Sequence, residues 1–577
     1  MITSWLLISI GAILQYPAVF EDSLPRSAAL FISTIPRATA LPYLFIICGW
    51  SICLTAIVRN AFKNHSNFLP YLITGVFLSS DSSFNTKNQE ESIFLISIDS
   101  LRADAITAEK TPNLYRFKNQ HTSFEQHFVG IPRTFPSWIE TLESQPAALS
   151  GIRHMFPTQP ERQQQSSTAT FAQALSLEGF HTALISDFAG DIFPRFENHY
   201  HTTQAPTFTL PSMLQLNITT HLRFFLPYIL TPPLRSIFPE IEASPIATNP
   251  QNLIHQAIQH LRSTPRKNMT TLFFSTAHFP YASPWPYYPA VTNETRFIFQ
   301  KNPDLSYTSL SSDEKKHIIK LYESSIQAID HACGALFQYL KDNQKWDSST
   351  IIITADHGEE LFDANRIQGH GEHLWGNAML HVPLLWKQKN HQKPQRIEHI
   401  TRSIDLGTTL IHQVSKTQKM QKNINFKFSG QNLNPWIDST NDQPFPQLSA
   451  FSETGLWFSN KGNAEFQLKR LWYPNINELI TIDKTTEKEV VLHHDYRQLT
   501  VTAKHRSLIS GEYKVLYIPT KKGIQWELYQ WKKDPHNIKN IAPSSPKKLL
   551  EMQEKLLSYM TFIEKRNRII NNFVVPL

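Results

Sequence analysis

Two apolar stretches of this chain end in side chains that can bind a metal ion. Residues 92–98 (SIFLISI) are followed by Asp99, and residues 350–355 (TIIITA) are followed by Asp356 and His357. In open α/β sheets the functional site lies at the carboxyl ends of the strands. Two carboxylates and an imidazole suit a divalent ion. The pattern predicts one metal site built from residues far apart in the sequence.

A hydroxyl side chain is the candidate nucleophile. Thr134 stands two residues before Pro136, which suits the first turn of a helix. The N-terminus of a helix attracts anions, and a hydroxyl beside a divalent metal can be deprotonated near neutral pH. The alternative interpretation is that Thr134 only caps the helix.

Further polar side chains follow other predicted strands. Asp187 follows residues 181–186, and His278 follows residues 270–276. Parallel strands bring such ends to one edge of a sheet, where carboxylates repel one another unless a cation is present. Asp187 and Asp191 are weaker candidates for the site, and Glu359 is interpreted as a supporting or surface residue.

An alternation of strand-like and helical segments must position these residues. Strand-like runs cover 93–98, 181–186, 270–276, 350–355 and 382–386, and helical patterns cover 168–178, 251–262 and 313–341. This order predicts an α/β fold with a mostly parallel central sheet and helices on both faces. Short extended runs after about residue 475 and a helix at 546–562 predict a smaller α+β subdomain.

Four regions are expected along the chain. We predict a membrane-anchor region at 1–80, a catalytic domain at 90–411, a variable connecting segment at 412–475 and a C-terminal subdomain at 476–577.

The N-terminal region is unusually apolar. Residues 2–20 and 41–58 are uncharged and long enough to cross a bilayer, and 68–79 is a weaker apolar stretch. The alternative is a buried helical hairpin. With Arg59 and Lys63 placed inside, the prediction is a membrane protein whose catalytic domain is extracytoplasmic.

Composition limits the class of protein and its partners. The chain has 577 residues, of which 41% are hydrophobic and 18% charged, so it is globular. A net charge of +7 suits an anionic substrate or membrane surface, although it also fits a basic exterior without a partner. No nucleic-acid motif is visible, and three cysteines indicate no disulfide framework.

From about residue 92 to 560 the chain resembles the sulfatase-like branch of the alkaline phosphatase superfamily. The motifs that carry the resemblance are 98–104 (IDSLRAD), 111–114 (TPNL), 134–142, 151–153 (GIR), 277–281 (AHFPY), 354–359 (TADHGE), 369–371 (GHG) and the segment from Ala503 to Pro535.

The resemblance implies residue roles and also shows departures. It implies a central sheet flanked by helices, with the metal held by Asp99, Thr134, Asp356 and His357. True sulfatases carry Cys or Ser where this chain has Thr134, and Asp187 replaces a cation that holds sulfate. A threonine at that position is similar to the phosphorus-handling members of the superfamily.

We therefore expect a metal-dependent hydrolase or transferase that acts on phosphoesters through a covalent Thr134 intermediate. His278 and His370 are its predicted proton donors, or ligands of a second metal ion. Zn²⁺ or Mn²⁺ is favoured, with Ca²⁺ or Mg²⁺ as alternatives. The expected partners are an anionic ester, a membrane lipid or a cell-envelope glycan. A sulfatase and a non-catalytic membrane binding module remain alternative functions.

Overall fold

The computed structural model describes most of the chain beyond residue 90 and two N-terminal segments. The described residues are 2–20, 41–64, 91–222, 224–231, 234–264, 267–289, 310–390, 393–414, 428–437, 444–457, 471, 474–483, 489–564, 567–570 and 573–576.

An eight-stranded sheet forms the centre of the molecule, in the order β10-β2-β9-β6-β1-β5-β3-β4. Its strands are β1 (Ser92–Ile98), β2 (Thr122–Phe128), β3 (His181–Ser186), β4 (Thr202–Gln204), β5 (Asn268–Phe274), β6 (Ser349–Thr354), β9 (His381–Lys387) and β10 (Gln395–Arg402). β1 pairs in parallel with both β5 and β6, whereas β9 is antiparallel to β2 and to β6. The sheet is therefore mixed but mostly parallel, as predicted.

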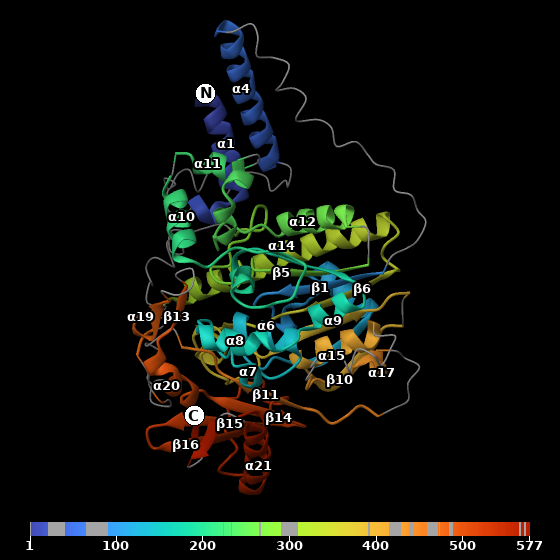
Figure 1. Cartoon of the computed structure of the whole chain (residues 1–577), viewed down its shortest axis with the longest axis vertical. Helices are drawn as coiled ribbons and strands as arrows, with labels where there is room; N and C mark the ends of the chain where they lie inside the picture. Colours follow the sequence, from blue (N-terminus) through green and yellow to red (C-terminus); the bar gives the residue numbers. More distant parts are fainter. Residues whose placement is uncertain are drawn as a thin grey trace.

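Helices cover both faces of this sheet (Figure 1). One layer holds α12 (Pro250–Ser263) and α14 (Ser312–Asp342), and the other holds α6 (Thr134–Glu143), α9 (Phe171–Leu177) and α15 (Ser403–Val414). Successive residues of β1 alternate between the layers: Phe94 and Ile96 join the core under α12 and α14, and Ile93 and Leu95 join the other core. β1 is buried along its whole length, which explains why its sequence is continuously apolar.

Shorter elements connect and extend these layers. They are α5 (Pro112–Gln120), α7 (Ala147–Ser150), α8 (Gln159–Ser166), α10 (Leu210–His221), α11 (Leu226–Ile229), α17 (Asn434–Ile437), α19 (Ile476–Leu479), α20 (Arg497–Thr502), the paired strands β7 (Glu360–Leu361) and β8 (Gln368–Gly369), β12 (Ile480–Ile482) and β13 (Val490–Leu492), and the 3-10 helices η1 (Ala103–Ala105), η2 (Phe188–Arg195), η3 (Leu234–Ile237), η4 (Pro239–Ala243), η6 (Asp363–Asn365) and η7 (His494–Tyr496).

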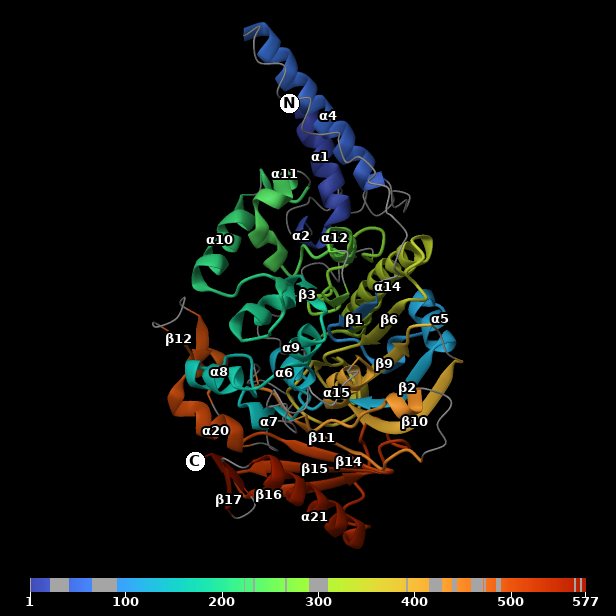
Figure 2. The same ribbon diagram turned by 45° about the vertical axis from the view of Figure 1, so that its right-hand side comes forward.

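A second, antiparallel sheet lies beside the central domain in both ribbon views (Figures 1 and 2). It has the order β11-β14-β15-β16 and packs against a C-terminal helix. Its elements are β11 (Ser449–Glu453), β14 (Arg506–Ser510), β15 (Tyr513–Thr520), β16 (Gly523–Tyr529) and α21 (Pro546–Ile563), followed by β17 (Asn567–Ile570) and β18 (Phe573–Pro576). β11 comes from the segment predicted to be a variable connection, so this sheet begins earlier in the chain than the expected subdomain. The four domain boundaries stay predictions.

The N-terminal helices project from the body beside α11 (Figure 2). α1 (Ile2–Gln15) is followed by α2 (Pro17–Phe20), and α4 (Leu41–Asn64) lies along α1. Gly11 and Gly49 allow the close approach, because a Cβ on either would lie within 2.6 Å of an isoleucine of the other helix.

The structure contradicts the prediction of membrane-spanning helices and of a membrane-anchored, extracytoplasmic protein. Among the described residues, no helix combines the length and the apolar character that a membrane crossing requires. α1 has 14 residues, about 21 Å at 1.5 Å per residue, whereas a bilayer core is about 30 Å thick. The weaker stretch 68–79 lies outside the described residues.

Candidate active site

Asp99, Asp356 and His357 meet at the carboxyl edge of the central sheet. β1 and β6 are parallel neighbours, with Ser97 opposite Thr354, so the residues that follow them emerge side by side. All three side chains are buried, and one ligand atom from each lies within 4.8 Å of the others. The structure thus brings together the side chains that the sequence indicated, and their role as metal ligands stays a prediction.

The imidazole of His357 is oriented toward the two carboxylates. Its Nδ1 lies 3.0 Å from the carbonyl oxygen of Gly358, which can only accept, so Nδ1 carries the proton. Nε2 then presents its lone pair 3.4 Å from Asp356 Oδ2 and 3.8 Å from Asp99 Oδ1. Burial lowers the pKa of His357 well below its usual value, with His370 adding to the effect. A neutral imidazole held by such a backbone contact is the form that binds metals.

Gly358 permits the tight turn beside this histidine. A Cβ at this position would lie 2.0 Å from the carbonyl oxygen of Ala378. The backbone N–H of Gly358 donates to the carbonyl of Met379 at 2.9 Å, which ties the turn to the loop that follows His370.

Thr134 is the first residue of α6, and its side chain faces the same cluster. Arg133 has extended dihedral angles and occupies the N-cap position, so Thr134 is not the cap. Its Oγ1 lies 3.4 Å from His357 Nε2, and the residue is 3% exposed. One turn further on, the hydroxyl of Ser137 donates to the backbone carbonyl of Asp356 and links the helix to the strand end.

The donor set and its unsatisfied atoms fit a divalent cation. The Oδ2 atoms of Asp99 and Asp356 are buried, and within the described part of the chain neither has a hydrogen-bond partner. Burial raises the pKa of both carboxyls well above the usual range, and for Asp356 the charge of Asp99 raises it further. A cation would remove this repulsion, and three oxygens with one imidazole nitrogen would hold it. Asp99, Thr134, Asp356 and His357 would supply those atoms.

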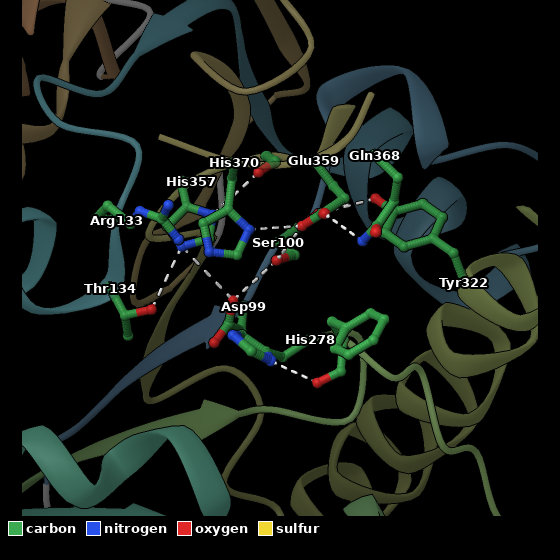
Figure 3. A network of polar contacts seen from close by, with 12 residues as sticks. Asp99, Ser100, Arg133, Thr134, His278, Tyr322, His357, Glu359, Gln368 and His370 are labelled. Atoms are coloured by element: carbon green, nitrogen blue, oxygen red, sulfur yellow. Dashed lines mark hydrogen bonds and ion pairs between the residues drawn. The ribbon is translucent and has the colours of Figure 1, made fainter. Parts of the chain in front are cut away.

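Two more imidazoles line the site next to His357 (Figure 3). The rings of His357 and His370 have centroids 4.1 Å apart, and those of His370 and His278 are 5.5 Å apart. Nδ1 of His278 lies 2.7 Å from the carbonyl oxygen of Phe279 and therefore carries a proton. Burial lowers the pKa of both His278 and His370. The structure therefore places both predicted proton donors beside the candidate metal-binding cluster.

Glu359 joins these groups, and the sequence interpretation underestimated it. The residue is 0% exposed, so it is not on the surface. Its Oε2 accepts from Ser100 Oγ at 2.9 Å and lies 2.8 Å from His370 Nδ1 (Figure 3). Its Oε1 accepts from the hydroxyl of Tyr281 at 2.9 Å and from Gln368 Nε2 at 3.1 Å. The signal that could have found it is its position, three residues after Asp356 at the same sheet edge.

Asp187 and Asp191 lie close enough to Asp99 to act on it electrostatically. Burial is the main reason why the pKa of Asp99 is raised, and the charges of Asp187 and Asp191 raise it further. Neither belongs to a three-residue metal cluster among the residues described.

Comparisons with known proteins were made for the sequence and for the fold. The family model described as Sulfatase matches residues 91–415. A multifunctional alkaline phosphatase superfamily protein, PehA of Trinickia caryophylli, is 31% identical over 108 residues. That match covers 18% of this chain and 20% of PehA, so the chain aligns with about a fifth of that protein's length.

Solved structures share the fold over most of the chain. A phosphonate monoester hydrolase from Silicibacter pomeroyi has a TM-score of 0.57 at 17% identity, covering 85% of this chain and 99% of its own. A protein solved with its substrate D-glucosamine-2-N,6-O-disulfate has a TM-score of 0.54 at 13% identity, with coverage of 82% and 98%. At these identities the likeness concerns the fold alone.

Proposed function

This chain belongs to the sulfatase family of the alkaline phosphatase superfamily, and from that premise we propose that it is a metal-dependent phosphoester hydrolase that works through a phospho-threonine intermediate. The observation that supports this most is the placement of Thr134, whose hydroxyl lies 3.4 Å from His357 Nε2 at the N-terminus of α6. Threonine would attack through the oxygen of its own unmodified side chain, whereas family members that cleave sulfate esters use a modified Cys or Ser at that position.

The first half of the reaction would use Thr134 and one histidine. Oγ1 of Thr134 gives its proton to solvent water before the substrate reacts, and it then forms a bond to phosphorus while the bond from phosphorus to the leaving oxygen breaks. His370 or His278 donates a proton to that leaving oxygen. Nδ1 of His370 is engaged by Glu359, and in the part of the chain described here its Nε2 has no protein partner. Nε2 is therefore the atom available to the substrate.

In the second half, water attacks the same phosphorus atom, and the bond to Thr134 breaks. The histidine that gave a proton now accepts one from the water. An alcohol in place of water would make the reaction a transfer to that acceptor. When bound by Asp99, Thr134, Asp356 and His357, a divalent ion would lower the pKa of the threonine hydroxyl and stabilise negative charge on the phosphoryl oxygens. Three oxygens and one imidazole favour Zn²⁺ or Mn²⁺.

Trapping the intermediate tests this proposal directly. The metal-loaded enzyme is mixed with a phosphodiester, quenched in acid and digested, and the peptide that contains Thr134 is analysed by mass spectrometry. We expect a phosphate on Thr134. Thr134→Ala should abolish turnover, whereas Thr134→Ser should keep part of it because a hydroxyl remains. Turnover by Thr134→Ala at the wild-type rate would refute the proposal.

Sulfate-ester hydrolysis is the second candidate, because the matching family model is that of sulfatases. Paired phosphate and sulfate esters of the same leaving group, each assayed with and without added metal, separate the two. A preference for the sulfate ester, with no phosphate found on Thr134, would favour this second function.

A further inference from the structure

The loop between β8 and β9 carries His370, and its backbone has little rigidity of its own. This His370 loop (residues 370–380) runs through turns and bends rather than through a helix or strand. Gly371 and Gly376 have φ angles of +75° and +74°, in the left-handed region that glycine reaches most easily. Glycine also loses the most conformational entropy on folding. The loop therefore depends on contacts from other segments to fix its position.

The C-terminal antiparallel sheet supplies such contacts near the far end of the His370 loop. The indole Nε1 of Trp375 donates to Glu527 Oε2 on β16 at 2.6 Å. The carbonyl of Gly376 accepts from Lys514 Nζ on β15 at 2.6 Å, and its N–H donates to Asn537 Oδ1 at 2.8 Å. The four side chains and backbones involved are buried, so breaking any of these hydrogen bonds leaves a polar group without water to replace its partner.

The same sheet also reaches the near end of the loop, next to His370. Just beyond β11, the N–H of Gly455 donates to the carbonyl of Gly371 at 3.0 Å. The side chain of Arg133 packs against both glycines, because a Cβ on Gly371 would lie 2.4 Å from its Nε and a Cβ on Gly455 2.2 Å from its Cγ. Arg133 immediately precedes Thr134. The antiparallel sheet therefore borders both the proposed nucleophile and the loop of the proposed proton donor.

We propose that Glu527 is a positioning residue for the proton donor His370 and acts through Trp375, an inference that rests on the proposed ester hydrolysis. Glu527 is fixed within its own sheet, because it also accepts from the Tyr529 hydroxyl at 2.7 Å and from Gln525 Nε2 at 2.7 Å. The carboxylate thus holds the indole in place instead of following it. Nε2 of His370 must lie within hydrogen-bond reach of the leaving oxygen to give it a proton. A shift of the loop would remove that reach.

The dependence of the rate on the leaving group separates positioning from general support of the fold. Phenolate needs a proton as it departs, whereas 4-nitrophenolate departs largely without one. A less stable fold lowers the fraction of active enzyme and so lowers kcat/KM for both esters by the same factor. A misplaced proton donor lowers it more for the phenyl ester. The quantity to measure is the leaving-group ratio, which is kcat/KM for methyl 4-nitrophenyl phosphate divided by kcat/KM for methyl phenyl phosphate, with the metal-loaded enzyme.

Substitutions along the path from Glu527 to His370 test the proposal. His370→Asn should raise the leaving-group ratio by about a hundredfold, which sets the upper limit. Trp375→Phe keeps a ring but removes the N–H that reaches Glu527, and it should raise the ratio by about tenfold. Glu527→Leu removes the acceptor and should have an effect of similar size, about tenfold.

Glu527→Gln is the conservative variant that should rescue the ratio. An amide oxygen at this position still accepts from Trp375 and from the Tyr529 hydroxyl. The amide of Gln525 can turn and present its oxygen to the new NH₂ group, so no buried polar atom loses its partner. We expect the leaving-group ratio of this variant to stay within about twofold of the wild-type value.

Trp531→Phe is the matched control on the same antiparallel sheet. Trp531 is also buried, and its indole Nε1 donates to the carbonyl of Gly511 at 2.8 Å, between β14 and β15. Its backbone carbonyl accepts from Asn377 Nδ2 in the His370 loop at 3.2 Å, and the substitution leaves that carbonyl in place. The control should lower the melting temperature as Trp375→Phe does, but it should leave the leaving-group ratio unchanged.

Several results would overturn the positioning role. They are an unchanged ratio in Trp375→Phe while His370→Asn raises it, an equal rise in Trp531→Phe, or a rise in His278→Asn but not in His370→Asn. Trp375→Phe carries the test if Glu527→Leu fails to fold.

A parallel series with phenyl sulfate and 4-nitrophenyl sulfate separates this inference from the proposed function. If the wild type hydrolyses only the sulfates, a raised ratio for these esters in Trp375→Phe would support the positioning role and refute the phosphoryl chemistry alone. Turnover of the phosphates with an unchanged ratio in Trp375→Phe would refute the positioning role alone. No turnover of either ester class by the wild type would overturn both.

Discussion

Two buried clusters of charged side chains in the described part of the molecule differ in how their charges are matched. At the edge of the central sheet, Asp99 and Asp356 face neutral imidazoles, and each has an unpartnered oxygen. The second cluster lies where the small antiparallel sheet meets the central domain. This inter-sheet ion-pair cluster consists of Arg153, Glu453, Lys504, Arg506 and Glu564.

Cations surround both carboxylates of the inter-sheet ion-pair cluster. Arg153 donates to Glu453 at 2.7 Å from Nε and to Glu564 at 2.8 Å from both Nη atoms. Although burial raises the pKa of Glu453, Arg153 and the neighbouring cations bring it down to about 2. In the active-site cluster burial instead raises the pKa of both carboxyls, and for Asp356 the charge of Asp99 raises it further.

The comparison teaches that matched buried charges hold parts of a fold together, whereas unmatched ones at a sheet edge are candidates for binding a ligand. It also explains Arg153, which the resemblance had included among its motifs: its guanidinium is occupied by two glutamates.

The largest effect is expected when the unmatched cluster loses a carboxylate. Asp356→Asn should lower bound metal and reduce kcat/KM by about a thousandfold. The stability of the metal-free protein should stay the same or rise, because repulsion with Asp99 is relieved. Metal analysis, steady-state kinetics and thermal unfolding in chelator measure the three quantities. Full metal occupancy in this variant would contradict the assignment.

Removing a carboxylate from the inter-sheet ion-pair cluster should have the opposite effect on stability. Glu453→Gln leaves buried cations unmatched, so we expect it to cost about 3–5 kcal/mol of unfolding free energy, measured in urea at pH 7. Glu551→Gln, which removes an ion pair on the exposed side of α21, is the control and should have little effect on the unfolding free energy. A cost for Glu453→Gln as small as that of the control would remove the distinction between the clusters.

The same glutamate predicts a pH dependence. The folded-state pKa of Glu453 is about 2, below its ordinary value of 4.5. Its contribution to stability is therefore complete above pH 4.5 and is lost as the pH falls toward 2, with a size on the order of 3 kcal/mol. Unfolding free energies of wild type and Glu453→Gln should converge over this range. Curves that stay parallel down to pH 2 would show that Glu453 is not held ionised.

The smallest effect should come from Glu359, which supports the active-site cluster without belonging to its predicted metal ligands. Glu359→Gln should keep the metal and lower kcat by about tenfold to a hundredfold, because His370 loses its charged partner. The measurements are the metal content of the variant and its kcat and KM, each determined separately. Loss of metal together with activity would instead place Glu359 among the groups that hold the ion.

Much of the active site was predictable because local patterns determine it. Residues 92–98 and 350–355 are continuously apolar, which indicates buried parallel strands, and parallel strands bring their carboxyl ends to one edge. The expected runs at 181–186 and 382–386 correspond closely to β3 and β9. β2 and β10 were missed because their sequences, TSFEQHF and QRIEHITR, are rich in polar residues.

The amino-acid sequence by itself determined which side chains emerge from strand ends and that Thr134 stands at a helix N-terminus, because strand and helix periodicity are local properties of the backbone. The tertiary structure decided which ends are neighbours. The order β6-β1-β5-β3 places Asp356 next to Asp99, and it separates Asp187 from Asp99 by one strand and from Asp356 by two. Pairing of β7 with β8 returns the chain so that His370 meets Glu359. Such contacts depend on packing between distant segments, so no short stretch of sequence specifies them.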